Sequence, residues 1–193
     1  MAAEGREPQV GPTAEETRAL QACLRGDRAA YEWIVMRYSA RALGVARGIL
    51  RDAALAEDAA QDAFVRAYRA LSRFDLREPF YPWFYRILKN ACLSALKRRP
   101  RGETSLDAPG APTPPAPPSD PAALASRNET RARIDAALAR VSEAHREILG
   151  LAHFDELSYK EIAACLAIPV GTVMSRLWAA RQALRKVLVP DEA

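Results

Sequence analysis

Five aromatic side chains fall within six residues near position 80, and two cationic residues lie close behind them. Aromatic rings stack on unpaired bases, at roughly 1–3 kcal/mol per base, while neighbouring cations contact phosphates. The pattern therefore predicts a surface that binds single-stranded nucleic acid. The alternative is that most of these rings fill a hydrophobic core, and we expect Trp83 and Ile87 to share a face and point inward. The segment comprises Phe80, Tyr81, Trp83, Phe84 and Tyr85, followed by Arg86 and Lys89.

A second stretch, from 157 to 184, has the spacing of a helix-turn-helix. Ser158 and Glu161 stand at capping-box spacing, so a helix is expected to start at Ser158. The apolar pattern breaks just before Pro169, which suits a first helical position, so a second helix is expected to follow. The predicted buried side of this second helix carries Val173, Leu177 and Leu184.

The other faces of this second helix carry Thr172, Met174, Ser175, Arg176, Trp178 and Arg181. An exposed helix of this kind fits the major groove of duplex DNA, where the base edges carry a readable code. The alternative is a helical hairpin that is merely buried. The short turn, and the basic groups that lie away from the apolar stripe, argue against that hairpin because it needs neither.

The residues from 57 to 66 predict a helix with an acidic face. Asp58, Gln61, Asp62 and Val65 share this face by steps of three and four residues. The acidic first half also suits the positive end of a helix dipole. Two interpretations stay open, namely a solvated polar face with ordinary dipole compensation or a docking surface for a basic partner.

Composition narrows the class of protein. The 193 residues are 49% hydrophobic with a net charge of +4, which permits nucleic-acid binding without demanding it. Cys23, Cys92 and Cys165 form no close pair, and His145 and His153 lie at no ligand spacing from them, so we expect buried free thiols in a reducing cytosol and no metal site. No apolar run suits a signal peptide or a membrane span, so we expect a cytoplasmic protein without membrane insertion.

Boundary signals divide the first hundred residues into four helices that are expected to form a bundle. Thr13 and Glu16 stand at capping-box spacing, Gly26 ends the first helix, and Asp27 and Asp52 cap the next two. These predicted helices run from 13 to about 25, from 28 to about 50, from 53 to 72 and from about 82 to 99. Two further helices, from about 122 to 140 and from 142 to 154, precede the helix-turn-helix.

Between positions 100 and 121 the composition changes sharply, because eight of the fourteen prolines lie there. Such a segment cannot bury enough apolar surface to fold, so we expect an extended, flexible linker. The predicted fold is all-α, with two small helical domains. Its parts are a disordered leader (1–12), a first domain (13–99), the linker (100–121), a second domain (122–189) and a tail that frays after position 190.

Taken together, these features resemble the extracytoplasmic-function sigma factors, the minimal two-domain class of bacterial sigma factor within the sigma-70 family. The resemblance covers nearly the whole chain outside the leader, the linker and the tail. It rests on motifs that occur in one order and are split by the proline-rich linker. These motifs span 26–31, 56–71 and 83–90 in the first domain, and 142–149, 157–163 and 168–173 in the second.

The resemblance implies a subunit that binds core RNA polymerase and directs promoter recognition and transcription initiation, with no cofactor and no reaction of its own. The acidic face (Asp58, Gln61, Asp62 and Val65) would dock on the clamp helices of the largest polymerase subunit. The 74–82 loop would hold an extruded base of the −10 promoter element. The residues implied in −10 and single-strand binding are Phe80, Tyr81, Trp83, Tyr85, Arg86, Lys89 and Asn90.

The last helix would read the −35 promoter element through the six residues given above, Thr172, Met174, Ser175, Arg176, Trp178 and Arg181. The linker would thread towards the active-site cleft and the RNA exit path of the polymerase. The polymerase flap and an anti-sigma factor are further implied partners.

Three departures from the family pattern bear on these roles. The family usually has Gly where Ala167 stands; if that position needs a positive φ, alanine costs on the order of 1 kcal/mol. The family usually has Lys or Arg where Met174 stands and often a basic residue where Ala179 stands, so we expect −35 readout to shift towards apolar groups such as thymine methyls. Ser94 stands where the family often has Asp.

Two other functions compete with this one. A free-standing regulator that binds duplex DNA as a dimer would account for the second domain alone. Such a regulator needs neither the aromatic segment nor the acidic helix. An enzyme is the least supported reading, because the sequence offers no nucleophile–base pair and no carboxylate cluster with a cofactor loop.

Overall fold

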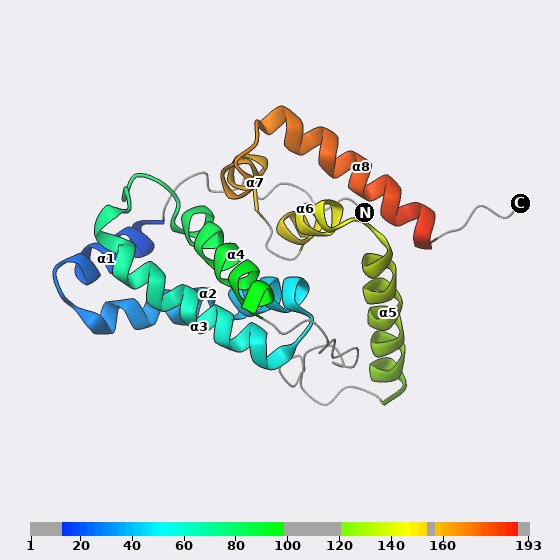
Figure 1. Cartoon of the computed structure of the whole chain (residues 1–193), viewed down its shortest axis with the longest axis horizontal. Coiled ribbons are helices and arrows are strands. Elements are labelled where there is room, and N and C mark those ends of the chain that lie inside the picture. Colours follow the sequence, from blue (N-terminus) through cyan, green and yellow to red (C-terminus); the bar gives the residue numbers. More distant parts are fainter. Residues whose placement is uncertain (1–12, 99–120, 154–156, 189–193) are drawn as a thin grey trace, which may run out of the picture.

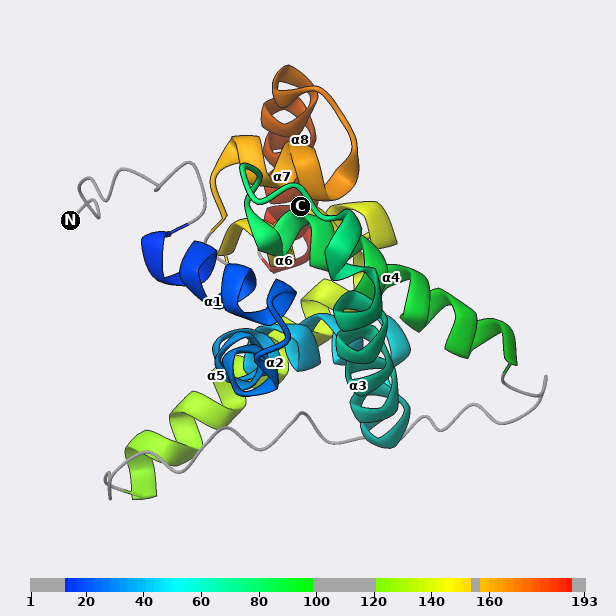
Figure 2. The ribbon, with the colours of Figure 1, turned by 90° about the vertical axis from the view of Figure 1, so that its left-hand side faces the viewer.

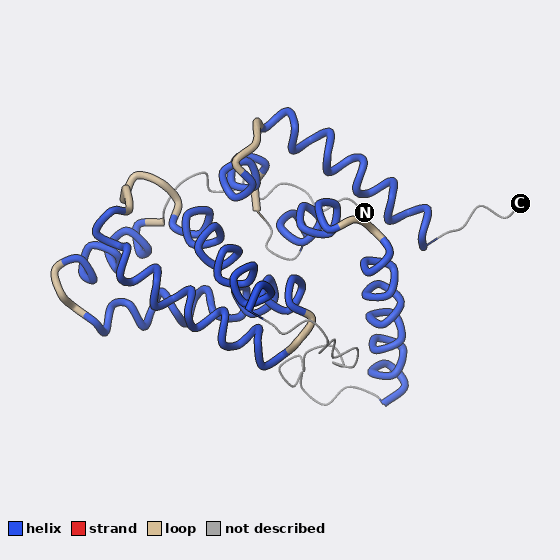
Figure 3. The backbone as a smooth tube through the Cα atoms, viewed as in Figure 1, coloured by secondary structure: helices blue, strands red, loops and turns tan. Residues whose placement is uncertain are grey.

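Every element that the structure describes is helical, as predicted (Figure 1). The structure is a computed structural model, and it describes residues 13–98, 121–153 and 157–188. Short loops join consecutive helices within the first domain (Figure 3). The elements are α1 Ala14–Leu24, α2 Arg28–Leu50, α3 Ala53–Ala70, the 3₁₀ turn η1 Leu71–Arg73, α4 Phe80–Arg98, α5 Pro121–Arg140, α6 Glu143–His153, α7 Tyr159–Leu166 and α8 Val170–Leu188.

Local signals set most helix ends close to where the sequence predicts them. The Asp27 carboxylate accepts hydrogen bonds from two backbone N–H groups in the first turn of α2. Asp52 caps α3 in the same way, and Gly26 ends α1 with φ at +96°. The α3 helix stops at Ala70, two residues short of the prediction, and η1 continues it.

The start of α4 differs from the prediction, because a residue distant in sequence fixes it. The helix begins at Phe80, two residues before Pro82. The Phe80 N–H donates to the buried carboxylate of Glu16 at 3.2 Å, and the Tyr38 hydroxyl donates to the same oxygen at 3.1 Å. The predicted capping box of α1 is therefore only half formed: Thr13 accepts from the Glu16 N–H, while the Glu16 carboxylate turns inward to α4.

The first domain packs α3 against both α2 and α4. Small buried side chains on α3 allow this close approach: Ala56, Ala59, Ala63 and Ala67. The rings of Phe64 and Phe84 stack between α3 and α4 with 4.5 Å between their centroids. This contact fixes the rotation of α4 about its axis, and so decides which of its side chains face away from the bundle.

The second domain has a smaller hydrophobic core, formed by α6, α7 and α8. Its fully buried members include Ile148, Ile162, Val173 and Ala180, with Leu151 and Leu177 nearly so. The chain turns between α7 and α8 at Ala167, which adopts φ 52° and ψ 47°. This is the left-handed conformation, with positive φ, in which the sequence analysis expects alanine to be unfavourable. The helix-turn-helix is therefore present.

The two domains lie against each other, with α7 seated on α4 (Figures 1 and 2). The buried apolar residues of both domains form one continuous cluster. The α5 helix extends away from this contact along one side of the molecule (Figure 2). The contact covers one side of α4, and this side carries part of the aromatic segment.

Several sequence expectations fall outside the described residues, namely the leader, nearly all of the linker, Phe154 and the tail.

Cys23, Cys92 and Cys165 are buried free thiols, as predicted. In the described ranges no single helix combines the length and the apolar character needed to cross a membrane. The α7–α8 pair, bent by 96°, meets that test on length and composition only.

Candidate nucleic-acid interface

The α4 helix directs its aromatic residues to two sides. Phe80 and Phe84 are fully buried within the first domain. Trp83 is half-buried and packs on Phe74 and Phe80, with ring centroids 4.9 Å and 5.5 Å apart. The inward pair expected from the sequence, Trp83 and Ile87, is therefore only partly inward, because Phe80 and Phe84 take the centre of the core. The Phe80 ring has no exposed face on which a base could stack.

Tyr85 lies on the other side of α4, beneath the second domain, and Tyr81, one turn earlier, stacks on Tyr38 of α2 with ring centroids 5.5 Å apart. Tyr85 is 1% exposed, and its hydroxyl donates to the Glu147 carboxylate of α6 at 2.6 Å. Burial, and then the negative charge of Glu147, raise the pKa of Tyr85 well above its usual value, so this hydroxyl remains a donor. Tyr81 lies 4.7 Å from the Arg41 guanidinium, a cation–π distance.

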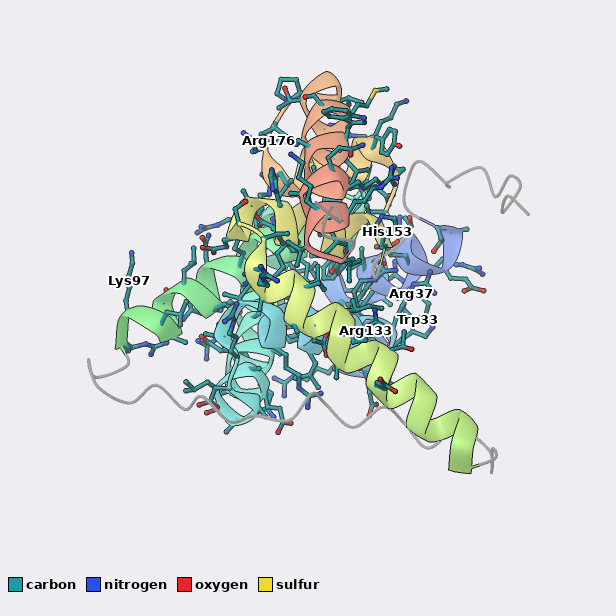
Figure 4. All side chains as sticks on the ribbon, turned by 90° about the vertical axis from the view of Figure 1, so that its right-hand side faces the viewer. Trp33, Arg37, Lys97, Arg133, His153 and Arg176 are labelled. Carbon is teal, nitrogen blue, oxygen red and sulfur yellow. The ribbon has the colours of Figure 1, made fainter. Side chains whose placement is uncertain are left out.

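The polar and cationic side chains of α4 are also divided. Lys89 follows Tyr85 by one turn, and its ammonium donates to the same Glu147 oxygen at 2.5 Å. Arg86 and Asn90 are exposed on the neighbouring face. Lys97 extends from the far end of α4 in Figure 4. An open cationic track therefore runs along α4 beside a covered patch, which we define as Tyr81, Tyr85 and Lys89.

The predicted acidic face lies on the outer side of α3. Asp58 and Gln61 are exposed, and Val65 is 47% exposed although it is apolar. Asp62 is less open, because its carboxylate pairs with Arg66 at 2.6 Å one turn further on. The structure therefore brings the four predicted residues onto one accessible surface.

This surface continues to Tyr68, a residue that the sequence analysis missed. Tyr68 follows Val65 by three residues and is 36% exposed. Its ring lies 4.8 Å from that of Tyr31, whose hydroxyl donates to the Phe64 carbonyl at 2.7 Å. The same three-residue step that links the predicted residues extends to Tyr68, so the sequence held the signal.

The helix-turn-helix forms as its caps predict. Ser158 and Glu161 make both halves of the capping box at the start of α7. Pro169 lies one residue before α8, and its carbonyl accepts the Val173 N–H at 3.1 Å, which begins the helix. Ala167 provides the left-handed turn between them.

The α8 helix buries the side that the sequence assigns to the core. Val173 and Leu177 are buried, and Leu184 is half-buried. Two large apolar side chains remain open to solvent, with Met174 56% exposed and Trp178 66% exposed. Exposed apolar groups of this size on a helix-turn-helix suit contact with methyl groups in a DNA groove.

The remaining predicted residues of α8 lie on two different parts of the helix surface. Arg176 and Ser175 are exposed, Thr172 is half-buried, and Figure 4 shows Arg176 extending sideways from α8. Arg181 lies elsewhere, close to His153 of α6. Burial, and then the charge of Arg181, lower the pKa of His153 below its usual value. Arg181 therefore borders a different feature from the outward face of α8.

That feature is an apolar groove of about 360 Å³ between α5, α6 and α8. It is lined by Ile134, Leu138, Leu149, His153, Arg181, Leu184, Arg185 and Leu188. Its walls are mostly apolar, and the lining also includes Arg181 and Arg185. A groove of this kind suits the apolar side of an amphipathic helix. The sequence analysis missed this groove because its lining comes from three helices whose packing no local pattern reports.

Comparison with known proteins follows the same division into two domains. The Sigma-70 region 2 family model matches residues 34–102, and the Sigma-70 region 4 model matches residues 137–186. The RNA polymerase sigma-H factor of Pseudomonas aeruginosa is 36% identical over 184 residues, covering 91% of this chain and 95% of the relative. The ECF RNA polymerase sigma factor SigW of Bacillus subtilis is 32% identical over 172 residues, covering 85% and 91%.

Solved structures agree with these matches. CnrH, solved in complex with the cytosolic domain of CnrY, superposes with a TM-score of 0.70 at 25% identity, covering 92% of this chain and 99% of CnrH. The sigma factor RpoE of Bartonella quintana, solved with the anti-sigma factor NepR, shares the fold with a TM-score of 0.65 at 21% identity, covering 84% and 98%. The chain belongs to the sigma-70 family of RNA polymerase sigma factors, in its extracytoplasmic-function class.

Proposed function

We propose that this sigma factor divides promoter binding between its two domains, 13–99 and 122–189. As a sigma factor it binds core RNA polymerase and directs promoter recognition and transcription initiation. The first domain would hold the polymerase and the melted −10 strand, and the second would read the −35 duplex. One observation carries this division: an exposed acidic and apolar face on α3 and an exposed reading face on α8 occur on one chain. Tethering the two activities raises the effective concentration of each, so neither needs high affinity alone.

The α3 face is assigned to core polymerase. Asp58, Gln61, Asp62 and Val65 present carboxylates around an exposed apolar side chain, and Tyr68 enlarges the apolar part. A basic helical surface with an apolar strip is the complementary partner, which fits the clamp helices of the largest subunit. The carboxylates speed encounter and fix register, while the apolar groups provide burial.

The α4 helix is assigned to the melted strand. Arg86 and Asn90 are open for phosphate and base contacts, and the covered patch supplies further rings and a cation. Phe80 and Trp83 support this surface from behind by packing on Phe74. The loop between η1 and α4 would hold the extruded base.

The outward face of α8 is assigned to the −35 duplex. Arg176 would contact a phosphate or a guanine edge, and Ser175 and Thr172 would contact the backbone. Met174 and Trp178 would lie against thymine methyl groups, which are the apolar features of the major groove. This assignment explains how Met174 can serve at a position where the family usually has a cation.

The apolar groove is assigned to the polymerase flap, since an amphipathic helix would bury its apolar side there. Arg181 would stand at the rim of that contact rather than on the DNA. An anti-sigma factor is a further partner, in keeping with the complexes in which CnrH and RpoE were solved. Competition for these polymerase-facing surfaces would make such a factor an inhibitor.

The test combines purified chain with core RNA polymerase. We expect co-elution in gel filtration, followed by transcription from a genomic fragment library in which core enzyme alone gives no defined start sites. Sequencing the 5′ ends of the transcripts identifies the promoters, and hence the −35 and −10 duplexes needed below. Failure to co-elute with core enzyme would refute the proposed function.

A further inference from the structure

One buried carboxylate of the first domain joins three helices. Glu16 of α1 is 4% exposed, and its Oε1 atom accepts the Tyr38 hydroxyl of α2 at 3.1 Å. The same atom accepts the Phe80 N–H at the start of α4 at 3.2 Å. Burial, and then the charge of Glu16, raise the pKa of Tyr38 above its usual value, so this hydroxyl remains a donor. A single oxygen therefore links α1, α2 and α4.

The second domain uses the same sequence motif differently. Thr13 and Glu16 begin α1 at the spacing that Ser158 and Glu161 have at the start of α7. At α7 the carboxylate turns back and accepts the Ser158 N–H, which completes the capping box. At α1 the carboxylate leaves its own helix and is buried against α2 and α4. Because burying a carboxylate is unfavourable without strong hydrogen bonds, this position has a role beyond capping α1.

The start of α4 takes its acceptor from another helix. Pro79 precedes α4, and its ring has no hydroxyl or carboxylate with which to cap the first N–H groups. Glu16 provides the acceptor from a position 64 residues earlier, and its charge suits the positive end of the helix dipole. A polar hollow of about 340 Å³ beside the carboxylate is lined by Arg37 and Arg41, which offset that charge. The place where α4 begins therefore depends on Glu16.

The loop that precedes α4 is held at both ends. It runs from 74 to 79, between η1 and α4, and it is the segment assigned to the extruded base. At its first end, the Phe74 ring lies 4.9 Å from that of Trp83. At its last end, the hydrogen bond from Phe80 to Glu16 fixes the backbone. Loss of this bond would leave the loop anchored at its first end only.

We propose that Glu16 is a positioning residue for recognition of the −10 element. Its carboxylate fixes the first turn of α4 and the end of the 74–79 loop, so the loop presents a formed site to the extruded base. Glu16 is buried, so it acts through Phe80 and not by contact with the strand. A preorganised site binds more tightly because less freedom is lost on binding. The inference rests on the proposed function, since it needs the loop to hold that base.

The probe is a labelled single-stranded oligonucleotide that carries the −10 sequence found by transcript sequencing. It is bound to the full chain assembled with core polymerase. Replacing one base at a time by an abasic site identifies the extruded base, as the position at which the native chain loses most affinity. The readout is the ratio of the affinities for the intact strand and for the strand that is abasic at that position.

This ratio distinguishes a displaced loop from a damaged fold. A smaller folded fraction lowers both affinities by the same factor and leaves the ratio unchanged. A loop that no longer holds the base weakens only the binding of the intact strand, so the ratio falls. Affinity for the −35 duplex and co-elution with core polymerase should not change in either variant below.

Glu16→Gln keeps the size of the side chain and removes its charge. We expect the ratio to fall about fivefold, because charged hydrogen bonds are replaced by weaker neutral ones. Tyr38→Phe keeps the ring and removes one of the two donors that hold the carboxylate, so we expect a fall of about twofold. Leu20→Ala is the control, because it removes a fully buried side chain one turn further along α1 and leaves the carboxylate in place. It should lower stability without changing the ratio.

The outcomes separate this inference from the proposed function. The inference is overturned if Glu16→Gln binds core polymerase and keeps the native ratio, or if Leu20→Ala lowers the ratio as much. Should Glu16→Gln fail to fold, an unchanged ratio in Tyr38→Phe overturns it instead. A native chain that loses no affinity at any abasic position would contradict the assignment of the loop, and with it the proposed division of promoter binding.

Discussion

The two helices that we assign to DNA binding, α4 and α8, both carry aromatic and cationic groups, and these groups differ in access. On α4, Tyr85 is 1% exposed and Lys89 is paired with Glu147. On α8, Trp178 is 66% exposed and Arg176 extends into solvent (Figure 4). Residue type alone does not distinguish an exposed aromatic and cationic surface from one that another domain covers. The helix assigned to the duplex is open in the structure, while the helix assigned to the melted strand is half covered by the second domain.

The largest expected effect separates the core side of α4 from the open side of α8. Phe84→Ala should lower the free energy of unfolding by about 3–5 kcal/mol, because it leaves a cavity between α3 and α4. Trp178→Ala should change it by less than about 0.5 kcal/mol, because the side chain is mostly exposed. Urea unfolding of the full chain measures both. Equal losses would contradict the contrast between the two aromatic residues.

The next effect concerns what the open side of α8 binds. Trp178→Ala should weaken binding to the −35 duplex by about 1–3 kcal/mol, the size of one lost base-pair contact. Fluorescence anisotropy at fixed salt provides the measurement. Replacing thymine by uracil in the duplex removes only the methyl groups, so it should weaken the native chain and have less effect on the variant. A native chain that is indifferent to uracil would rule out methyl readout.

The sequence analysis succeeded where a feature depends on near neighbours. Asp27, Asp52 and Ser158 cap their helices because each needs only the next three residues. The steps of three and four residues along α3 likewise placed Asp58 and Val65 on one face. Such signals belong to the chain before it folds, so they survive in any tertiary setting.

The sequence analysis failed where a partner comes from far along the chain. It placed the start of α4 at Pro82, because nothing near Phe80 reveals that Glu16 will accept its N–H. It listed Tyr85 and Lys89 as strand contacts without their partner in the structure, because Glu147 reaches them only through domain packing. Sequence patterns predict least well the partners of polar groups that bond to other helices.

A charge reversal sharpens the division between the two domains. Asp62→Arg should weaken binding to core polymerase about tenfold, since it puts a cation beside Arg66 on the face assigned to a basic partner. Its affinity for the −35 duplex should not change, whereas Arg176→Ala should show the reverse. Glu15→Arg carries the same charge change at an exposed position of α1 and serves as the control. The same loss from Asp62→Arg and Arg176→Ala would refute the division of labour.

The smallest effect tests whether the turn that presents α8 is strained. Ala167 adopts φ 52° and ψ 47°, where a Cβ atom costs about 1–2 kcal/mol. Glycine removes that strain but adds freedom to the unfolded chain, about 0.4–1 kcal/mol, so Ala167→Gly should give a net gain near 0.5–1 kcal/mol. Ala163→Gly lies inside α7 and should instead cost about 1 kcal/mol, since glycine is unfavourable in a helix interior. Opposite shifts in the thermal unfolding midpoint are expected from the same substitution made four residues apart. If both midpoints fall, the left-handed turn is not a source of strain, and alanine at this position is fully compatible with the reading helix.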